Sequence, residues 1–367
     1  MASYDLSPLL VLALLSLLLG ALPLGWIAFR HRHAAPGVRL RALTFLTLFL
    51  TFDLVVFGAF TRLTDSGLGC PDWPGCYGSA SPLGARADIQ TAQTAMPTGP
   101  VTHGKAWVEM VHRYLASVVG VLCIALAIAS WRAQRLGHAV MSPWWATATL
   151  VWVCVQGAFG ALTVTMKLYP AIVTAHLLGG LALLGLLAVQ SQAYLRAPLS
   201  LPRAVHRGVW VVLVLSIIQI TLGGWVSTNY AVLACSDFPT CQGQWWPEMD
   251  FEHGFAVLRE LGTGKDGGYL PFAALTAIHF THRVGALIVL GAMLWLAWGL
   301  FATRDLAARR WAWGLFGIAV WQLASGLSNV VLGWPLVAAL AHTAGAAALI
   351  TLLAVMLARA RQARAGS

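Results

Sequence analysis

The sequence predicts an all-α polytopic membrane protein with two pseudo-symmetric four-helix transmembrane bundles and one extra N-terminal helix. Three observations support this fold. Of the 367 residues, 59% are hydrophobic and 10% are charged; apolar stretches of spanning length recur; and the second half of the chain repeats motifs of the first. So apolar a composition lies outside the range of soluble globular domains, so a lipid bilayer is the expected solvent.

Nine apolar stretches are long enough to cross the hydrocarbon core, which takes about 20 helical residues. They occupy approximately residues 8–29, 40–62, 106–131, 143–166, 172–195, 208–228, 273–300, 311–332 and 336–359. The first stretch is followed, not preceded, by a basic cluster, Arg30-His31-Arg32-His33. A secretory signal has the reverse order. We therefore expect residues 1–38 to form a retained transmembrane helix and a basic loop.

The net charge of +10 does not indicate nucleic-acid binding, because the basic residues mark one side of a membrane. They gather in the connections at 30–41, 132–135, 196–207 and 304–310 and in the C-terminal tail. The positive-inside tendency places these segments in the cytoplasm. The two long connections, 63–105 and 230–272, are then extracytoplasmic.

Three sets of matched residues in the same order indicate an internal duplication. The loop sequence CPDWPGC (Cys70 to Cys76) recurs as CSDFPTC (Cys235 to Cys241), and EMVHR (Glu109 to Arg113) corresponds to HFTHR (His279 to Arg283). The third set pairs Gln156, Gly160 and His176 with Gln322, Gly326 and His342. We predict an N-terminal four-helix bundle over 40–195 and a C-terminal one over 208–360, in parallel orientation.

Four histidines lie a few residues inside the predicted helices, near the extracytoplasmic side: His112, His176, His282 and His342. An ionisable side chain within a bilayer is costly and favours a functional role. Each predicted bundle has one such histidine on its second helix and one on its fourth, which suits the two axial positions of haem iron. The alternative is a core histidine bonded to a carbonyl. Zinc is disfavoured, because its sites use three or four protein ligands.

The two halves differ at one matched position, where Glu109 precedes His112 by three residues and His279 precedes His282. Residues three apart share a helix face, so Glu109 should face the same cavity as His112. There it could take a proton, orient water or stabilise a developing cation; alternatively, it is a buried acid paired with Arg113. The asymmetry predicts chemistry in the first bundle and an electron-relay haem in the second.

The remaining polar residues near the predicted helix ends and within the spans have either a structural role or a choice between a structural and a haem-binding role. Arg113 and Arg283 could pair with haem propionates or extend to the interface as ordinary snorkelling side chains. The loop cysteines predict disulfides Cys70–Cys76 and Cys235–Cys241 in an oxidising compartment. Gln156, Gln219 and Gln322 are suited to hydrogen bonds between helices. Asp53, on the second span, either faces the bundle interior or contacts the first helix.

Long strings of the sequence closely resemble the haem A synthase family of cytochrome oxidase assembly. They are TRLTDSGLGCPDWPGC (Thr61 to Cys76), EMVHR (Glu109 to Arg113), LGGWVSTNYAVLACSDFPTCQGQWWP (Leu222 to Pro247) and the later HR and AH pairs. The resemblance covers about residues 40–360, and the first helix departs from the family's usual eight spans.

The resemblance implies oxidation of a ring methyl of haem O to a formyl group, with oxygen taken from water. It implies that His112 and His176 flank the substrate haem, with Glu109 as the catalytic carboxylate. His282 and His342 would ligate a haem b (iron) cofactor, and the loop cysteines would be the family's disulfide pairs.

The implied setting is the lipid bilayer of a bacterial cytoplasmic (inner) membrane, with haem O as substrate and no nucleic acid. Candidate partners are haem O synthase, cytochrome oxidase assembly factors and a second copy of the chain, whereas the electron acceptor is unknown. Two other functions stay open, a bis-histidine electron carrier of the cytochrome b type and a haem transporter or chaperone. Glu109 distinguishes them, because a carrier needs no acid beside one ligand pair in one half only.

Overall fold

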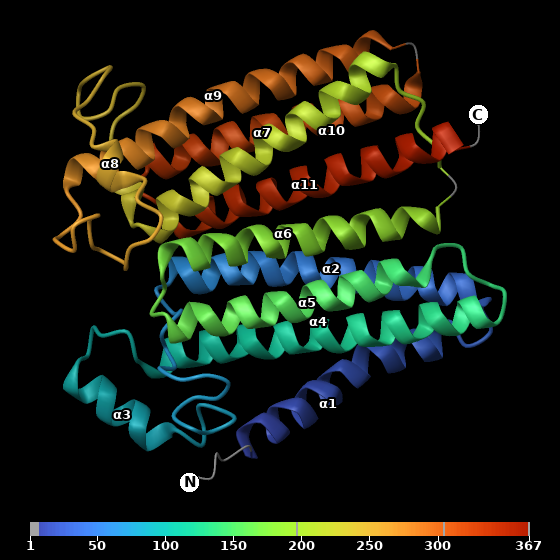
Figure 1. Ribbon diagram of the computed structural model, residues 1–367, viewed down its shortest axis with the longest axis horizontal. Helices are drawn as coiled ribbons and strands as arrows, with labels where there is room; N and C mark the ends of the chain where they lie inside the picture. Colours follow the sequence, from blue (N-terminus) through green and yellow to red (C-terminus); the bar gives the residue numbers. More distant parts are fainter. Residues whose placement is uncertain (1–6, 196, 304, 366–367) are drawn as a thin grey trace. The chain divides into compact units, whose positions relative to one another are not determined.

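The computed structural model describes residues 7–195, 197–303 and 305–365, which are all-helical apart from connecting loops (Figure 1). Nine helices in these ranges are long and apolar enough to cross a membrane: α1 (Ser7–Arg30), α2 (Pro36–Leu63), α4 (His103–Arg135), α5 (Pro143–Thr165), α6 (Pro170–Ala193), α7 (Arg203–Thr228), α9 (Phe272–Ala302), α10 (Leu306–Val331) and α11 (Leu336–Ala365). They coincide with the nine predicted stretches, so the all-α polytopic class is confirmed. The first six residues of the predicted 1–38 element, and Arg196 and Arg304, lie outside the described residues.

The long connections contain short helices that the apolar pattern did not predict. They are α3 (Arg86–Ala95) in the first connection and a 3-10 turn (Ala231–Leu233) and α8 (Phe251–Gly254) in the second. α3 packs against α4, and α8 packs against α9. Both connections are therefore folded against the ends of the helices that carry Glu109 and His279.

The chain forms two compact units, Met1–Leu168 and Tyr169–Ser367. In the first unit, α4 packs against α1, α2 and α5. In the second, α7, α9, α10 and α11 pack in a ring of neighbours, and α6 packs against α7 and α11. The predicted bundle boundaries, 40–195 and 208–360, and the pseudo-symmetry between the bundles stay predictions, and α6 groups here with the second unit.

Local sequence explains where the helices begin and how closely they pack. Pro36, Pro143 and Pro170 stand in the first turns of α2, α5 and α6, where a missing N–H has no helical partner to lose. Gly20 lets α1 approach α4, because a Cβ there would lie 2.7 Å from Val121 Cγ1. The extra N-terminal helix is therefore part of the first unit.

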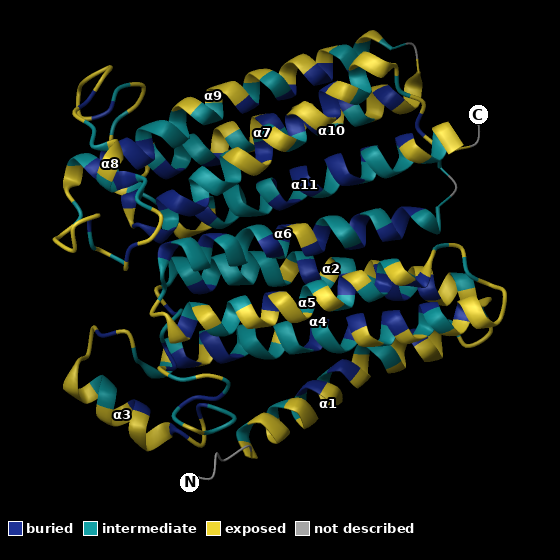
Figure 2. Ribbon diagram, in the orientation of Figure 1, coloured by how far each residue is buried: buried dark blue, intermediate teal, exposed yellow. Residues whose placement is uncertain are grey.

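Several hydroxyl groups in the spans are satisfied by the backbone of their own helix, and many exposed side chains are apolar. Thr44 and Thr47 are fully buried in α2 and donate to the carbonyls of Leu40 and Leu43, four residues earlier, as a hydroxyl in an apolar solvent must. Exposed side chains on α1 and α9 (Figure 2) include Leu18, Leu22 and Trp298. Asp53 on α2 is exposed, so it is not packed in the interior, and its contact with the first helix stays a prediction.

Both predicted disulfides are present, Cys70–Cys76 and Cys235–Cys241. In each loop an aspartate caps a left-handed turn. Asp72 accepts from the amides of Tyr77 and Gly78. Asp237 accepts from Gln242 and Gly243 at 2.6 and 3.0 Å and from the Thr240 hydroxyl. The matched loop sequences therefore have the same local structure.

Removing the Asp237 charge should loosen the second loop in a pH-dependent manner. Hydrogen bonds from the Thr240 hydroxyl and from the Gly243 and Gln242 amides lower the pKa of Asp237 from 3.8 to about 2. Because the folded pKa lies below the unfolded one, this stabilisation is complete above about pH 4 and lost as pH falls through about 2. In Asp237→Asn, hydrogen exchange of the Gln242 and Gly243 amides should be faster at neutral pH, and the difference from wild type should vanish near pH 2.

The matched control is Glu248→Gln, which neutralises an exposed acid in the same loop and should leave both amides as protected as in wild type. Equal protection in wild type and Asp237→Asn at neutral pH would contradict the capping role.

Candidate functional site

Glu109 is buried in the first unit and held by two partners. It lies on α4, whose first turn is capped by the Thr102 hydroxyl, and it is only 4% exposed. Its Oε2 accepts from the Cys70 amide at 2.7 Å, and its Oε1 pairs with Arg113. The ion pair foreseen as the structural alternative is therefore present, and the carboxyl group is fixed beneath the disulfide loop.

Arg113 ties this loop to α4. Its Nη1 donates to the carbonyls of Asp72, Pro74 and Gly75 at 3.0, 3.1 and 2.6 Å. These contacts exclude simple snorkelling, because the guanidinium turns into the loop. Contact of Arg113 with a propionate stays a prediction.

His112 lies one turn beyond Glu109 and faces α2. Its ring stacks on Phe57, with 6.3 Å between ring centroids and 9° between planes. A Cβ at Gly58 would lie 3.0 Å from His112 Nε2, so the glycine leaves space beside the imidazole. His176 is half-buried on α6, in the second unit, and its pairing with His112 stays a prediction.

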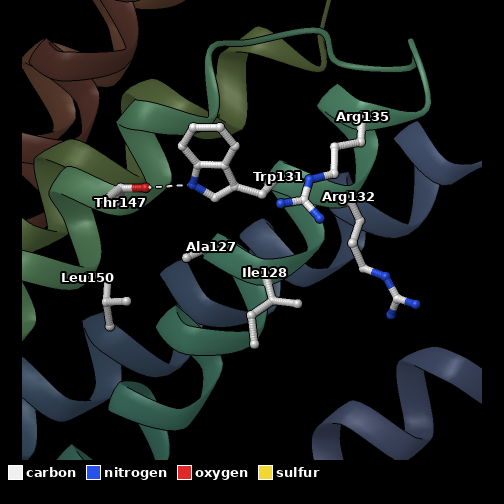
Figure 3. Close-up of a pocket in the computed structure, with 7 residues that line it drawn as sticks. All are labelled: Ala127, Ile128, Trp131, Arg132, Arg135, Thr147 and Leu150. Carbon is white, nitrogen blue, oxygen red and sulfur yellow. Dashed lines mark hydrogen bonds between the residues drawn. The ribbon is translucent and has the colours of Figure 1, made fainter.

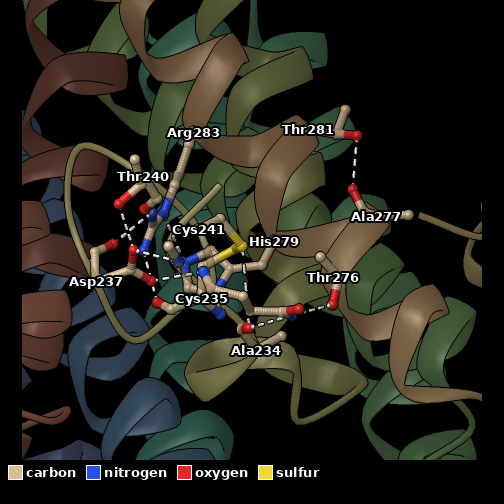
Figure 4. Close-up of a disulfide and its surroundings, with 12 residues drawn as sticks. Ala234, Cys235, Asp237, Thr240, Cys241, Thr276, Ala277, His279, Thr281 and Arg283 are labelled. Atoms are coloured by element: carbon tan, nitrogen blue, oxygen red, sulfur yellow. Dashed lines mark hydrogen bonds between the residues drawn. A yellow bond between two sulfur atoms is a disulfide. The ribbon is translucent and has the colours of Figure 1, made fainter. Parts of the chain in front are cut away.

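In the second unit, His279 takes the structural place of Glu109. The Cys235 amide donates to His279 Nδ1 at 3.3 Å. Arg283 donates to the carbonyls of Asp237, Thr240 and Cys235 at 2.8, 2.9 and 2.6 Å (Figure 4). An imidazole thus anchors the loop as the carboxylate does, so anchoring alone does not require the acid in the first unit.

His282 is held on α9 by side chains of α7. Gln219 Nε2 lies 2.9 Å from His282 Nδ1 and also 2.9 Å from the His282 carbonyl oxygen. A Cβ at Gly223, one turn further along α7, would lie 2.9 Å from His282 Cε1. The ring is therefore confined between a polar partner and a glycine.

His342 on α11 has a similar environment built by α10. Ser325 Oγ lies 3.0 Å from His342 Nδ1, and a Cβ at Gly326 would lie 3.2 Å from His342 Cε1. His282 and His342 lie on α9 and α11 of the second unit, and both of these helices pack against α7 and α10. Nδ1 of each ring has a polar neighbour, which leaves Nε2 as the nitrogen that a metal would bind. In histidine ligands Nδ1 donates its hydrogen to an acceptor, a role open to Ser325 Oγ and, once its amide turns, to Gln219 Oε1. This pair fits the two axial positions of haem iron.

A surface cleft elsewhere in the first unit does not share this chemistry. It lies between the far ends of α4 and α5 and is lined by Ala127, Ile128, Trp131, Arg132, Arg135, Thr147 and Leu150 (Figure 3). Trp131 Nε1 donates to Thr147 Oγ1 at 3.0 Å. Trp131 lies roughly 30 Å along α4 from Glu109, at 1.5 Å per residue. The cleft is therefore separate from the candidate site.

Sequence reasoning missed the residues that shape the space around the histidines: Phe57, Gly58, Gly223 and Ser325. A signal for two of them was present. Gly58 and Gly223 each stand 12 residues before the first cysteine of their loop. Extending the repeat alignment backwards from the cysteines would have found them.

Comparisons with known proteins give a consistent result. Residues 41–354 match the model of the COX15-CtaA family, described as cytochrome oxidase assembly protein. A haem A synthase of Shewanella oneidensis is 36% identical over 324 residues, which cover 84% of this chain and 92% of that protein. Haem A synthases of Halalkalibacterium halodurans and Methylobacterium nodulans are each 28% identical, over 81% and 83% of this chain and 88% of their own length.

The family match extends through the two cysteine loops and all four helix histidines. The chain therefore belongs to the COX15-CtaA family of cytochrome oxidase assembly proteins.

Proposed function

We propose that this chain is a haem A synthase, a multi-pass membrane oxidoreductase that converts a ring methyl of haem O to a formyl group with oxygen from water. Haem O binds in the first bundle beside Glu109, with His112 and His176 as its axial ligands. The conversion releases four electrons and four protons per methyl group oxidised, and the electrons leave through the second bundle.

The replacement of Glu109 by histidine in the other half carries the proposal. The matched His279 accepts a hydrogen bond from Cys235 just as Glu109 does from Cys70, and Arg283 holds its loop without a carboxylate partner at position 279. The acid is thus dispensable for loop structure. A buried carboxylate kept in one half only, one turn from a haem-ligand candidate, suits proton transfer or stabilisation of positive charge.

The chain holds Glu109 in one position for this role. The Cys70 amide and Arg113 fix its two oxygens, and Arg113 is itself fixed by three loop carbonyls. A carboxyl group fixed before the reaction does not have to be reorganised during it. Glu109 accepts a proton as water adds its oxygen to the substrate methyl carbon, and it balances positive charge that develops there.

The second bundle holds haem b through His282 and His342. When bound, haem b supplies reversible one-electron transfer. The chain's own residues supply the site: Gln219 and Ser325 contact the Nδ1 atoms, and Gly223 and Gly326 leave space beside the rings. An electron carrier of the cytochrome b type would need this bundle, but it would not need Glu109.

The orientation follows from charge and from the disulfides. Basic connections lie on the cytoplasmic side, which puts both disulfide loops on the extracytoplasmic face of a bacterial cytoplasmic membrane. Disulfides persist in that oxidising compartment. Haem O therefore reacts near the extracytoplasmic surface.

Glu109→Gln should abolish turnover without disturbing the second haem. The amide preserves size and can still accept from the Cys70 amide, but it has no charge and does not accept a proton at neutral pH. Conversion of haem O in the purified protein, followed by mass spectrometry of the extracted pigment, should fall at least about 100-fold.

The Glu109→His control introduces the residue of the second half, keeps a loop anchor and should be equally inactive. Turnover near the wild-type rate in either variant would rule out Glu109 as the catalytic carboxylate. The same result would favour a carrier or transporter.

Replacing the histidines should separate two haem populations. His282→Ala or His342→Ala should remove the low-spin haem b signal, because one axial ligand is lost. His112→Ala or His176→Ala should leave that signal and prevent tight binding of added haem O. Haem-to-protein ratios and absorption spectra of purified variants measure both. Loss of the same haem in all four variants would contradict the division between bundles.

A further inference from the structure

The Gln219 amide contacts His282 at two points that act together. It reaches Nδ1 of the ring and the backbone oxygen of the same residue, each at 2.9 Å. Bonding to both fixes the rotation of the imidazole about its side-chain bonds, since the ring cannot turn without breaking the first contact. The bulk of the amide also lies against the α9 backbone, because a Cβ at Gly285 would overlap Gln219 Oε1.

The Gln219 oxygen is the second feature of this contact. Oε1 is buried, and among the described residues it has no hydrogen-bond partner. Leaving a buried acceptor unsatisfied is costly, so the amide is matched to a state in which this oxygen is used. An imidazole that binds a metal through Nε2 carries its hydrogen on Nδ1 and needs an acceptor there. A half-turn of the amide would bring Oε1 to that hydrogen, at the cost of the bond to the His282 carbonyl.

The partner histidine also has a glutamine of the preceding helix beside it, although the oxygen of this amide is satisfied. With its NH2 group turned toward α11, the Gln322 amide lies 2.8 Å from His342 Nδ1 and 3.2 Å from the His342 carbonyl oxygen, while its oxygen accepts from the Ala346 amide at 2.7 Å. One glutamine from the preceding helix therefore attends each imidazole of the second unit.

The two halves differ in these glutamines. Gln156 stands at the position matched to Gln322. The position matched to Gln219 is occupied by Leu54, because Leu54 and Gln219 each lie 16 residues before the first cysteine of their loop. A leucine side chain cannot hydrogen-bond an imidazole. The polar contact from this position is thus specific to the half that retains its haem.

We infer that Gln219 is a positioning residue that fixes His282 for permanent haem ligation and sets the electron donation of its imidazole to iron. The inference rests on the proposed function of His282 and His342 as haem b ligands. Gln219 acts through His282, and a hydrogen bond accepted from Nδ1–H makes the ring a stronger ligand.

The experiment compares Gln219→Leu, which introduces the first-half residue, with Gln219→Glu, which supplies a stronger acceptor. Wild-type and variant proteins are purified with haem bound. The measurements are the rate of haem transfer to apomyoglobin, the low-spin spectrum and the midpoint potential. Gln219→Leu should release haem about 10–100-fold faster. Gln219→Glu should retain haem at the wild-type rate with a more negative midpoint potential, because a carboxylate increases electron donation through the ring.

Thr221→Val is the matched control, because its exposed hydroxyl on the same helix bonds only to the Ile217 carbonyl among the described residues; it should match wild type throughout. A role limited to helix packing predicts lower thermal stability in both Gln219 variants with an unchanged potential in Gln219→Glu, and that result would overturn the inference. So would wild-type haem release from Gln219→Leu. If Gln219→Leu fails to fold, the potential of Gln219→Glu alone decides. Haem retention by His282→Ala would instead show that the proposed function is wrong.

Discussion

Satisfying polar groups in an apolar solvent is the constraint on which the rest of this structure depends. Helices pair their own backbone groups, but each helix end and each loop must find other partners. One arginine in each unit supplies hydrogen bonds to the disulfide loop. Arg113 and Arg283 each donate to carbonyls on both sides of a disulfide loop. Because each arginine directly follows a candidate haem ligand on the helix, the contacts that fix the loop also fix the start of the ligand-bearing helix.

The same constraint explains how a duplicated scaffold could diverge at one residue. The position occupied by Glu109 and His279 must accept a hydrogen bond from a buried cysteine amide. A carboxylate and an imidazole both meet this requirement, so the loop tolerates either. The residue at this position is therefore free to differ between the halves, and in the proposed function the carboxylate serves the half that oxidises haem O.

The sequence predicted the features that depend on composition and spacing. Apolar length located all nine spans, because a bilayer demands about 20 apolar residues whatever their packing. The repeated loop predicted both disulfides. The rotation of each helix about its axis and the close approaches between helices could not be predicted. A transmembrane helix is apolar on every side, so its sequence does not indicate which side faces a neighbouring helix. Hence Gln219 was recognised as an interhelical donor but not as the partner of His282, and the glycines beside the rings were missed.

Substrate and cofactor place opposite demands on otherwise similar ligand sets. Haem O must enter and its product must leave, whereas an electron-relay haem must stay through every turnover. Imidazole ligation alone does not distinguish these cases, because both halves supply histidines at matched positions. The distinction must come from what surrounds the rings. Gln219 contacts His282 at Nδ1 of the ring and at the backbone carbonyl oxygen, and these directional contacts confine the ring. Hydrogen bonding of this kind around a ligand ring is a physical basis for retaining a haem in the second unit.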